Sequence, residues 1–304
     1  MEKTLKDIRL GTRQSKLALA QANIVKDLIE SKYRNISVTL VPIKTLGDDV
    51  SRSSDLVQNK SIFTSELENA LLSGKIDIAV HSMKDLPSAL DPTFTIAGTP
   101  ERADARDALV TLKGYKLKEL PSGARIGTSS LRRKYQIKEL RSDIDIVDIH
   151  GNVDTRVRKV KENQLDGIIV AACGLQRLGM EDLISEFFEV DQIIPAACQG
   201  ILALEVLGKN TYAIEIAREI NHVETYNASH CERIFLKEVG GDCNDIVAAY
   251  ATVKRERVSF LALLGLPEKM HIERYRSESL DDIHMVARRA ATTLLQKIHT
   301  VKPR

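Results

Sequence analysis

The sequence predicts an α/β protein with more than one domain, and two observations carry this prediction. Over the first two hundred residues, short β-branched runs alternate with helix-length segments, as in parallel or mixed sheets covered by helices. After about residue 220 the pattern changes to one helix, two strands and a final helix, which predicts a small α+β domain. At 304 residues the chain can form two or three domains that each bury a core.

The N-terminal segment predicts a βαβ unit. Residues 7–12 and 37–43 are apolar runs typical of strands, and residues 14–31 between them have helical periodicity. The apolar face of this helix is predicted to consist of Leu17, Ala20, Ile24 and Leu28. Further strands are predicted at residues 75–80, 107–111, 144–149 and 167–172.

Two segments of the chain echo each other. Residues 8–21 and 124–137 both place Gly-Thr directly after an apolar strand and before a helix. If the echo is more than chance, it predicts two similar α/β domains, each with a strand-to-helix turn that favours an anion. For the C-terminal domain we predict a helix over 222–240 ended by glycine, strands at 245–253 and 257–266, and a helix within 280–299.

The charge distribution, the low aromatic content and the absence of several motifs argue against some classes of function. The net charge is only +2, but the segment from Arg125 to Arg177 has seven Arg and four Lys against seven Asp plus Glu. Aromatic residues make up 4% of the chain and Trp is absent, so platforms for stacking bases are scarce and small anions fit better than a nucleic acid. GxGxxG, Walker and HExxH motifs are absent, which argues against nicotinamide, P-loop and zinc-hydrolase chemistry.

The four cysteines form no CxxC pair. We expect Cys173, Cys198 and Cys231 to be small buried hydrophobic residues. Cys243 lies in the turn after the first helix of the last domain, where its spacing disfavours metal binding and a disulfide but identifies no other role. The N-terminus has no apolar region of a signal peptide and no window has eighteen continuous apolar residues, so we expect a cytoplasmic protein.

Charged residues follow several predicted strands, where ligands of open α/β sheets gather. Lys84 and Asp85 follow the strand at 75–80. Asp85 could stabilise a cation or transfer a proton. The alternative is that the two residues are a surface lysine and a capping aspartate. Guanidinium groups bind carboxylate or phosphate through two parallel hydrogen bonds, although any one arginine could serve only solubility. The arginines at strand ends are Arg13, Arg132, Arg133, Arg156 and Arg177.

Several motifs together resemble hydroxymethylbilane synthases, the porphobilinogen deaminase family, in order and over nearly the whole chain. The last domain is the weakest match beyond its cysteine. The motifs are LGTRQSKLALAQ, DIAVHSMKDLP, ERADARDALV, IGTSSLRRKYQ, HGNVDTRV, AACGLQRLG, PAACQG and ERIFLKEVGGDC.

The resemblance implies three domains: 1–100 with 200–220, then 101–199, then 221–304. The first two would be alike and similar in fold to periplasmic binding proteins, with the active site between them. The family condenses four porphobilinogen molecules head to tail, releasing ammonia each time, and then hydrolyses off the linear tetrapyrrole hydroxymethylbilane. A dipyrromethane cofactor, joined by a thioether to a cysteine of the third domain, primes the chain.

The resemblance also implies residue roles. Asp85 would be catalytic, assisting loss of the amine and stabilising positive charge on the pyrrole nitrogens, and Cys243 would hold the dipyrromethane. No metal is expected, and the partner would be the small molecule porphobilinogen, with a monomeric protein and no nucleic acid or membrane. Cofactor contacts are expected from Lys84, Ser129, Arg132, Arg133 and Arg156. Substrate contacts are expected from Arg13, Gln21, His150, Arg156 and Arg177.

The chain departs from the family pattern at several positions. His150 replaces the usual arginine and cannot make a two-pronged carboxylate contact. Asp242 stands beside Cys243 where the family has glycine, and should disfavour the thiolate. Cys198 replaces a glycine and Ser65 a lysine. The altered cysteine loop would also permit a non-catalytic anion-binding protein on the same scaffold, and the arginines alone would permit binding of phosphate esters.

Overall fold

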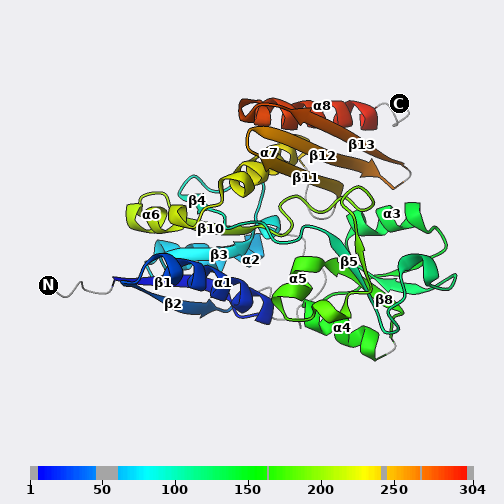
Figure 1. Ribbon diagram of the computed structural model, residues 1–304, viewed down its shortest axis with the longest axis horizontal. Coiled ribbons are helices and arrows are strands. Elements are labelled where there is room, and N and C mark those ends of the chain that lie inside the picture. Colours follow the sequence, from blue (N-terminus) through cyan, green and yellow to red (C-terminus); the bar gives the residue numbers. More distant parts are fainter. Residues whose placement is uncertain (1–5, 46–60, 163, 241–244, 268, 300–304) are drawn as a thin grey trace. The chain divides into compact units, whose positions relative to one another are not determined.

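The computed structural model describes residues 6–45, 61–162, 164–240, 245–267 and 269–299 (Figure 1). The chain forms two compact units. The first consists of Met1–Arg102 with Ile201–Tyr226, and the second of Ala103–Gly200 with Asn227–Arg304.

The first unit is built on a five-stranded mixed sheet of order β2-β1-β3-β10-β4. β1, β2 and β3 are parallel, and β10 is antiparallel to its neighbours β3 and β4. The predicted strands of this unit are therefore confirmed, and the sheet gains two that the sequence did not reveal. The bounds are β1 (Lys6–Arg13), β2 (Ile36–Ile43), β3 (Ile78–Ser82), β4 (Phe94–Gly98) and β10 (Leu202–Leu207).

Helices cover both faces of this sheet. α1 (Lys16–Lys32) and α6 (Thr211–Glu219) share one core with β1, β2, β3 and β10, and α2 (Ser61–Leu72) packs on the other face. The predicted buried face of α1 is wrong, because Ile24 and Leu28 are 38% and 36% exposed. The buried face is a different one, on which two alanines and a polar glutamine lie beside two aliphatic side chains. The buried residues are Ala18, Gln21, Ala22, Val25 and Ile29.

The second unit begins with another five-stranded mixed sheet, of order β7-β6-β8-β5-β9. β6, β7 and β8 are parallel and β5 is antiparallel to β8 and β9, so the sheet repeats the topology of the first. β6 occupies the position that β1 has in the first unit, which confirms the echo between residues 8–21 and 124–137. The bounds are β5 (Asp107–Thr111), β6 (Arg125–Gly127), β7 (Asp145–Val147), β8 (Gly167–Ala171) and β9 (Glu186–Phe188).

The echoed Gly-Thr pairs have the same packing reason in both sheets. A Cβ on Gly11 would lie 2.2 Å from Ile76 Cδ1, and one on Gly127 would lie 2.7 Å from Leu165 Cδ1. Glycine therefore lets a neighbouring chain pack directly on the strand end. The helices of this sheet are α3 (Leu131–Leu140), α4 (Val153–Lys161) and α5 (Ala172–Arg177).

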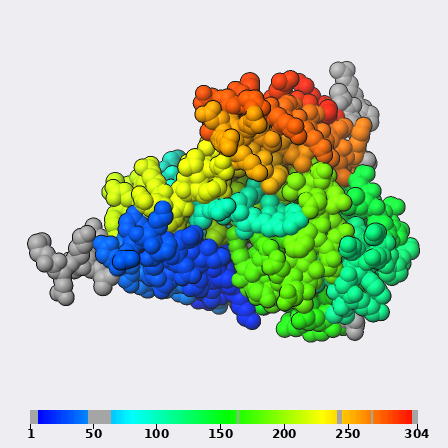
Figure 2. Space-filling model, viewed as in Figure 1, coloured from blue at the N-terminus to red at the C-terminus, as the bar shows by residue number. Residues whose placement is uncertain are grey.

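The C-terminal part of the second unit is a three-stranded antiparallel sheet with two helices, so the predicted helices and two strands are confirmed and a third strand, β13, is added. β11 (Ile246–Lys254), β12 (Arg257–Leu266) and β13 (Lys269–Ser277) form a meander. α7 (Val223–Val239) and α8 (Ile283–His299) share a core with one face of this sheet, and Figure 2 shows α8, in red, at the molecular surface. Gly240, with φ of 63°, ends α7 as expected.

Short 3-10 segments complete the described structure: η3 (Met83–Asp85), η4 (Leu117–Glu119), η5 (Glu181–Leu183) and η6 (Leu280–Asp282). Cys173, Cys198 and Cys231 are buried and form no disulfide with one another, which confirms the prediction for them. Cys243, Asp242 and the loop around them lie outside the described residues. No helix within the described ranges is long and apolar enough to cross a membrane.

Candidate functional site

In the first unit, β3 carries the predicted catalytic residue to the edge of the sheet. β3 ends at Ser82 and passes into η3, which contains Lys84 and Asp85. Met83 is buried and its N–H donates to Ile201 O at 2.9 Å, so the turn is anchored on the neighbouring chain. The side chain of Asp85 is exposed and that of Lys84 is half-buried. A fixed turn therefore presents an accessible carboxylate.

Two further predicted residues of this unit lie near the same sheet edge. Arg13 ends β1, which is parallel and adjacent to β3, so the carboxyl ends of both strands meet at one edge. Gln21 is buried on α1, and its Nε2 donates to Ser82 Oγ at 2.8 Å. The amide therefore holds the last residue of β3, directly before the turn that carries Asp85.

A buried polar pair beneath this turn was missed by the sequence reasoning. His81 Nε2 lies 3.0 Å from Glu205 Oε2, and neither side chain is accessible to solvent. Burial and then the charge of Glu205 raise the pKa of Glu68, on α2. The sequence contains one indication of this pair, which is a glutamate inside the apolar run of β10. A charge at such a buried position needs a partner in the fold.

In the second unit, Arg132 and Arg133 lie at the start of α3 and converge on Asp107. Arg132 Nη1 donates to Asp107 Oδ2 at 2.7 Å, and Arg133 Nη2 donates to Asp107 Oδ1 at 2.7 Å. The two arginines are 3% and 6% exposed and Asp107 is fully buried. Burial alone would raise the pKa of Asp107, but the two guanidinium groups outweigh it and hold the pKa below its usual range.

Gln199 completes this cluster. Its Nε2 donates to Asp107 Oδ1 at 2.9 Å and to Ala105 O at 2.8 Å. Arg132 also donates to Ile194 O, and Arg133 to Ile169 O, so α3 is tied to β8 and to the segment before Gln199. Asp107 and Gln199 were not predicted. An aspartate beginning an otherwise apolar strand was the available signal.

Arg156 and Arg177 have a different environment. Both are half-buried, and each donates to a backbone carbonyl: Arg156 Nε to Gly151 O, and Arg177 Nη2 to Gly200 O, both at 2.8 Å. No carboxylate of the described residues pairs with either one. Burial, and then the charge of Arg133, lower the pKa of Arg156 to about 10, and burial lowers the pKa of Arg177. A bound anion would offset this unfavourable burial of positive charge.

Ser129 and His150 lie in the segments that follow β6 and β7. Ser129, after β6, donates from Oγ to Ile149 O at 2.7 Å and accepts from Ile149 N at 2.9 Å. His150 follows Ile149 and is exposed, shortly before α4 begins with Val153. The structure thus joins the ends of β6 and β7 near the helix that carries Arg156.

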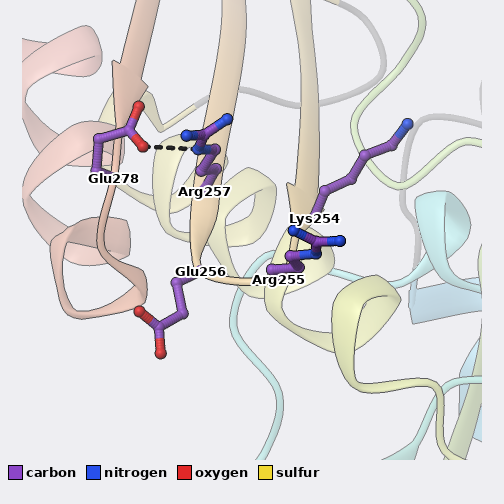
Figure 3. A pocket seen from close by; sticks show the side chains of 5 residues that line it. All are labelled: Lys254, Arg255, Glu256, Arg257 and Glu278. Carbon is purple, nitrogen blue, oxygen red and sulfur yellow. Dashed lines mark hydrogen bonds and ion pairs between the residues drawn. The ribbon is translucent and has the colours of Figure 1, made fainter.

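The C-terminal part of the second unit has a surface pocket at the turn between β11 and β12 (Figure 3). Arg257 Nε lies 2.7 Å from Glu278 Oε2, so one of the basic side chains that line the pocket is already paired. None of the predicted site residues lines this pocket, and it does not belong to the candidate site. The lining residues are Lys254, Arg255, Glu256, Arg257 and Glu278.

Comparison with known proteins decides the family. A sequence model described as "Porphobilinogen deaminase, dipyromethane cofactor binding domain" matches residues 8–215. The porphobilinogen deaminase of Syntrophomonas wolfei is 45% identical over 264 residues, which is 86% of each chain. The chain belongs to the porphobilinogen deaminase family. The porphobilinogen deaminase of Roseiflexus castenholzii is 40% identical to this chain over 276 residues, which cover 90% of this chain and 91% of the relative.

Solved structures of other proteins overlap more loosely. The methionine-binding protein MetQ has a TM-score of 0.46 at 12% identity, covering 75% of this chain and 91% of its own. The effector-binding domain of BenM, solved with benzoate, has a TM-score of 0.42 at 13% identity, covering 74% and 95%. For this member of the porphobilinogen deaminase family, these two likenesses concern the fold alone.

Proposed function

We propose that this chain is a hydroxymethylbilane synthase, which joins four porphobilinogen molecules head to tail with release of ammonia and then hydrolyses off the linear tetrapyrrole. The observation that carries the proposal is the family match over residues 8–215, because this stretch includes Asp85 and all five arginines assigned to the site. Relatives with the same family name align over most of both chains.

The dipyrromethane cofactor fits the residues present. Arg156 and Arg177 are half-buried guanidinium groups that pair with no carboxylate of the described chain, and pyrroles carrying acetate and propionate groups would supply such carboxylates. When bound through a thioether to Cys243, the cofactor would supply the primer to which pyrroles are added. Lys84, Ser129, Arg132, Arg133 and Arg156 are proposed to hold it.

Arg132 and Arg133 would act with part of their hydrogen-bonding capacity only. Four donors already converge on Asp107, and each guanidinium has further N–H groups that a cofactor carboxylate could use. The paired Asp107 also lessens the net positive charge of the cluster. We therefore propose that these two residues position the cofactor, while Arg156 and Arg177 contribute the larger share of the attraction for anions.

Substrate is proposed to contact Arg13, Gln21, His150, Arg156 and Arg177. Asp85 is the proposed catalytic residue. Its accessible carboxylate would accept a hydrogen bond or a proton from the reacting nitrogens and would stabilise positive charge as ammonia leaves. The anchored turn keeps that carboxylate in one place, which lowers the cost of reorganisation during the reaction.

We propose three domains, 1–100 with 200–220, 101–199 and 221–304. We also propose a monomer that works in the cytoplasm with porphobilinogen as its small-molecule partner and without nucleic acid.

The decisive experiment is the intact mass of the purified protein together with an assay of product formation. We expect two extra condensed pyrrole units, Ehrlich's colour reaction, and formation of tetrapyrrole from porphobilinogen. The Cys243→Ser variant should lack the adduct, and the adduct on another cysteine would show that the wrong thiol was assigned. An unmodified protein that forms no tetrapyrrole would overturn the proposal.

The role of Asp85 is tested by Asp85→Ala, with Asp27→Ala as a control at an exposed aspartate of α1. We expect Asp85→Ala to abolish turnover with an unchanged urea midpoint, and Asp27→Ala to retain normal turnover. Near-normal product formation by Asp85→Ala would refute the catalytic assignment while leaving the family unaffected.

A further inference from the structure

Two exposed histidines of the C-terminal domain face each other across a helix pair. His230 on α7 and His284 on α8 have their Nε2 atoms 3.2 Å apart. Their rings are nearly perpendicular, at 77°, and the ring centres are 4.9 Å apart. None of the residues assigned to the candidate site lies on α7 or α8, and nothing in the proposed synthase reaction uses this pair.

The two helices are held together directly beside this pair. Cys231 and Ile283, the sequence neighbours of the two histidines, are buried, and Cys231 Sγ lies 3.9 Å from Ile283 O. α7 and α8 also share the main apolar core of the domain. The backbone positions from which the two imidazoles project are therefore fixed, and the ring pair does not depend on flexible segments.

The distance between the two nitrogens matches two ligands of one metal ion. Around a tetrahedral ion with metal–nitrogen bonds of about 2.0–2.1 Å, two imidazole nitrogens lie roughly 3.3 Å apart. The ring centres would then be roughly 5.2 Å apart. A straight N–H···N bond at the observed separation would place the ring centres farther apart, at about 5.5 Å. The observed 4.9 Å is nearer to the first value.

The chemistry of the pair agrees with this geometry. Neutral imidazole is a common ligand of Zn²⁺, Cu²⁺ and Ni²⁺. The charge of Arg233 acts on His230 and would oppose a cation, so we expect moderate affinity. No third His, Cys, Asp or Glu of the described chain joins the pair in a metal-binding group, and water would complete the coordination.

We propose that His230 and His284 form a binding site for a divalent transition-metal ion, with Zn²⁺ as the probe. The ion would join α7 to α8 through two Nε2 bonds and so stabilise the C-terminal domain. α7 ends at Gly240, immediately before the loop of Cys243. The ion would therefore stabilise the helix that leads into the proposed cofactor attachment segment.

The test is a titration of the full chain, freed of metal with EDTA, with ZnCl₂ in a calorimeter. We expect one site, and at least a tenfold loss of affinity in His230→Ala and in His284→Ala. His299→Ala is the matched control, because His299 is also exposed and also lies on α8. Repeating the titration in Cys243→Ser separates zinc bound by that thiol from zinc bound by the histidines.

Two further measurements make the result unambiguous. Cu²⁺ bound to the wild-type chain should show two coordinating nitrogens by electron paramagnetic resonance, and one or none in His284→Ala. Zn²⁺ at tenfold above its dissociation constant should raise Tm by roughly 3 °C in the wild type only. Equal zinc affinity in the wild type and in the double variant His230→Ala/His284→Ala, or no binding at 1 mM Zn²⁺ (about the millimolar limit of weak association), would overturn the proposal.

Discussion

Replacing Asp107 by asparagine tests whether the buried arginine cluster is a major support of the second unit. Asp107 accepts from Arg132 Nη1, from Nε and Nη2 of Arg133, and from Gln199 Nε2, over distances of 2.7–3.0 Å. In Asp107→Asn one oxygen becomes an NH₂ group, which cannot accept from Arg132. Two guanidinium groups that are almost inaccessible to solvent are then left without a balancing negative charge.

The expected loss of unfolding free energy is about 3–5 kcal/mol, as for other buried ion pairs that lose one partner. With a urea m-value of about 2–3 kcal/mol/M, the midpoint should fall by roughly 1–2 M. The control is Asp143→Asn, whose carboxylate also lies 2.7 Å from an arginine, Arg141, but at side-chain exposures of 37% and 22%. We expect a much smaller fall there, because solvent screens exposed pairs. Equal falls in the two variants would refute the reasoning.

The stability of Asp107→Asn should also depend less on acid pH than that of the wild type. The folded pKa of Asp107 is lowered, so its contribution to stability is complete above the usual aspartate value of about 3.9 and is lost as pH falls below it. Urea midpoints measured from pH 6 down to pH 3 should therefore decline less steeply in Asp107→Asn than in the wild type. Parallel declines would show that Asp107 is not protonated on unfolding.

Three further predictions concern single side chains. Arg156→Gln should lower kcat/KM for porphobilinogen by roughly 10- to 100-fold, which is the value of a charged hydrogen bond. The urea midpoint should not fall, because the lost charge has no carboxylate partner in the described chain. A lower midpoint with normal kinetics would contradict this prediction. Cys198 has φ of 62°, so Cys198→Gly should be more stable than Cys198→Ala by about 1 kcal/mol in urea unfolding, since only glycine relieves the left-handed backbone; equal stability would mean the backbone is not strained. His150→Arg should lower KM for porphobilinogen, and an unchanged KM would mean that this position does not contact substrate.

Burial on both faces of a sheet helped to reveal two strands but did not reveal β10, which is also buried over most of its length. Residues 107–111 and 167–171 are wholly buried, and their continuous apolar runs reveal them directly. β13 was missed because it alternates charged and partly buried residues, with only one face on the core. The face of α1 was predicted wrongly because Leu17, Ile24 and Leu28 outweighed the alanines, although small residues allow the helix to lie close to the sheet.

For the candidate site, the sequence located residues at strand ends but could not give their partners. Asp107 is 25 residues before Arg132, and Glu205 is 124 residues after His81. Both pairings follow from strand order, because β5 and β10 are the antiparallel strands of their sheets. Local patterns contain no information on such neighbours. Residue types and their places after strands were therefore predictable, whereas burial and pairing were not.

The five arginines are thus unequal, although the sequence presents them alike. Arg132 and Arg133 use their charge on Asp107 and tie α3 to Ile194 and Ile169. Arg177 ends α5, which follows β8, and its Nη2 donates to Gly200 O next to Gln199 of the cluster, so we expect the position of its guanidinium to depend on this cluster. Asp107→Asn should consequently raise KM for porphobilinogen even under conditions where the variant is fully folded. An unchanged KM would mean that the cluster supports stability alone and that substrate attraction rests on Arg156 and Arg177 independently of it.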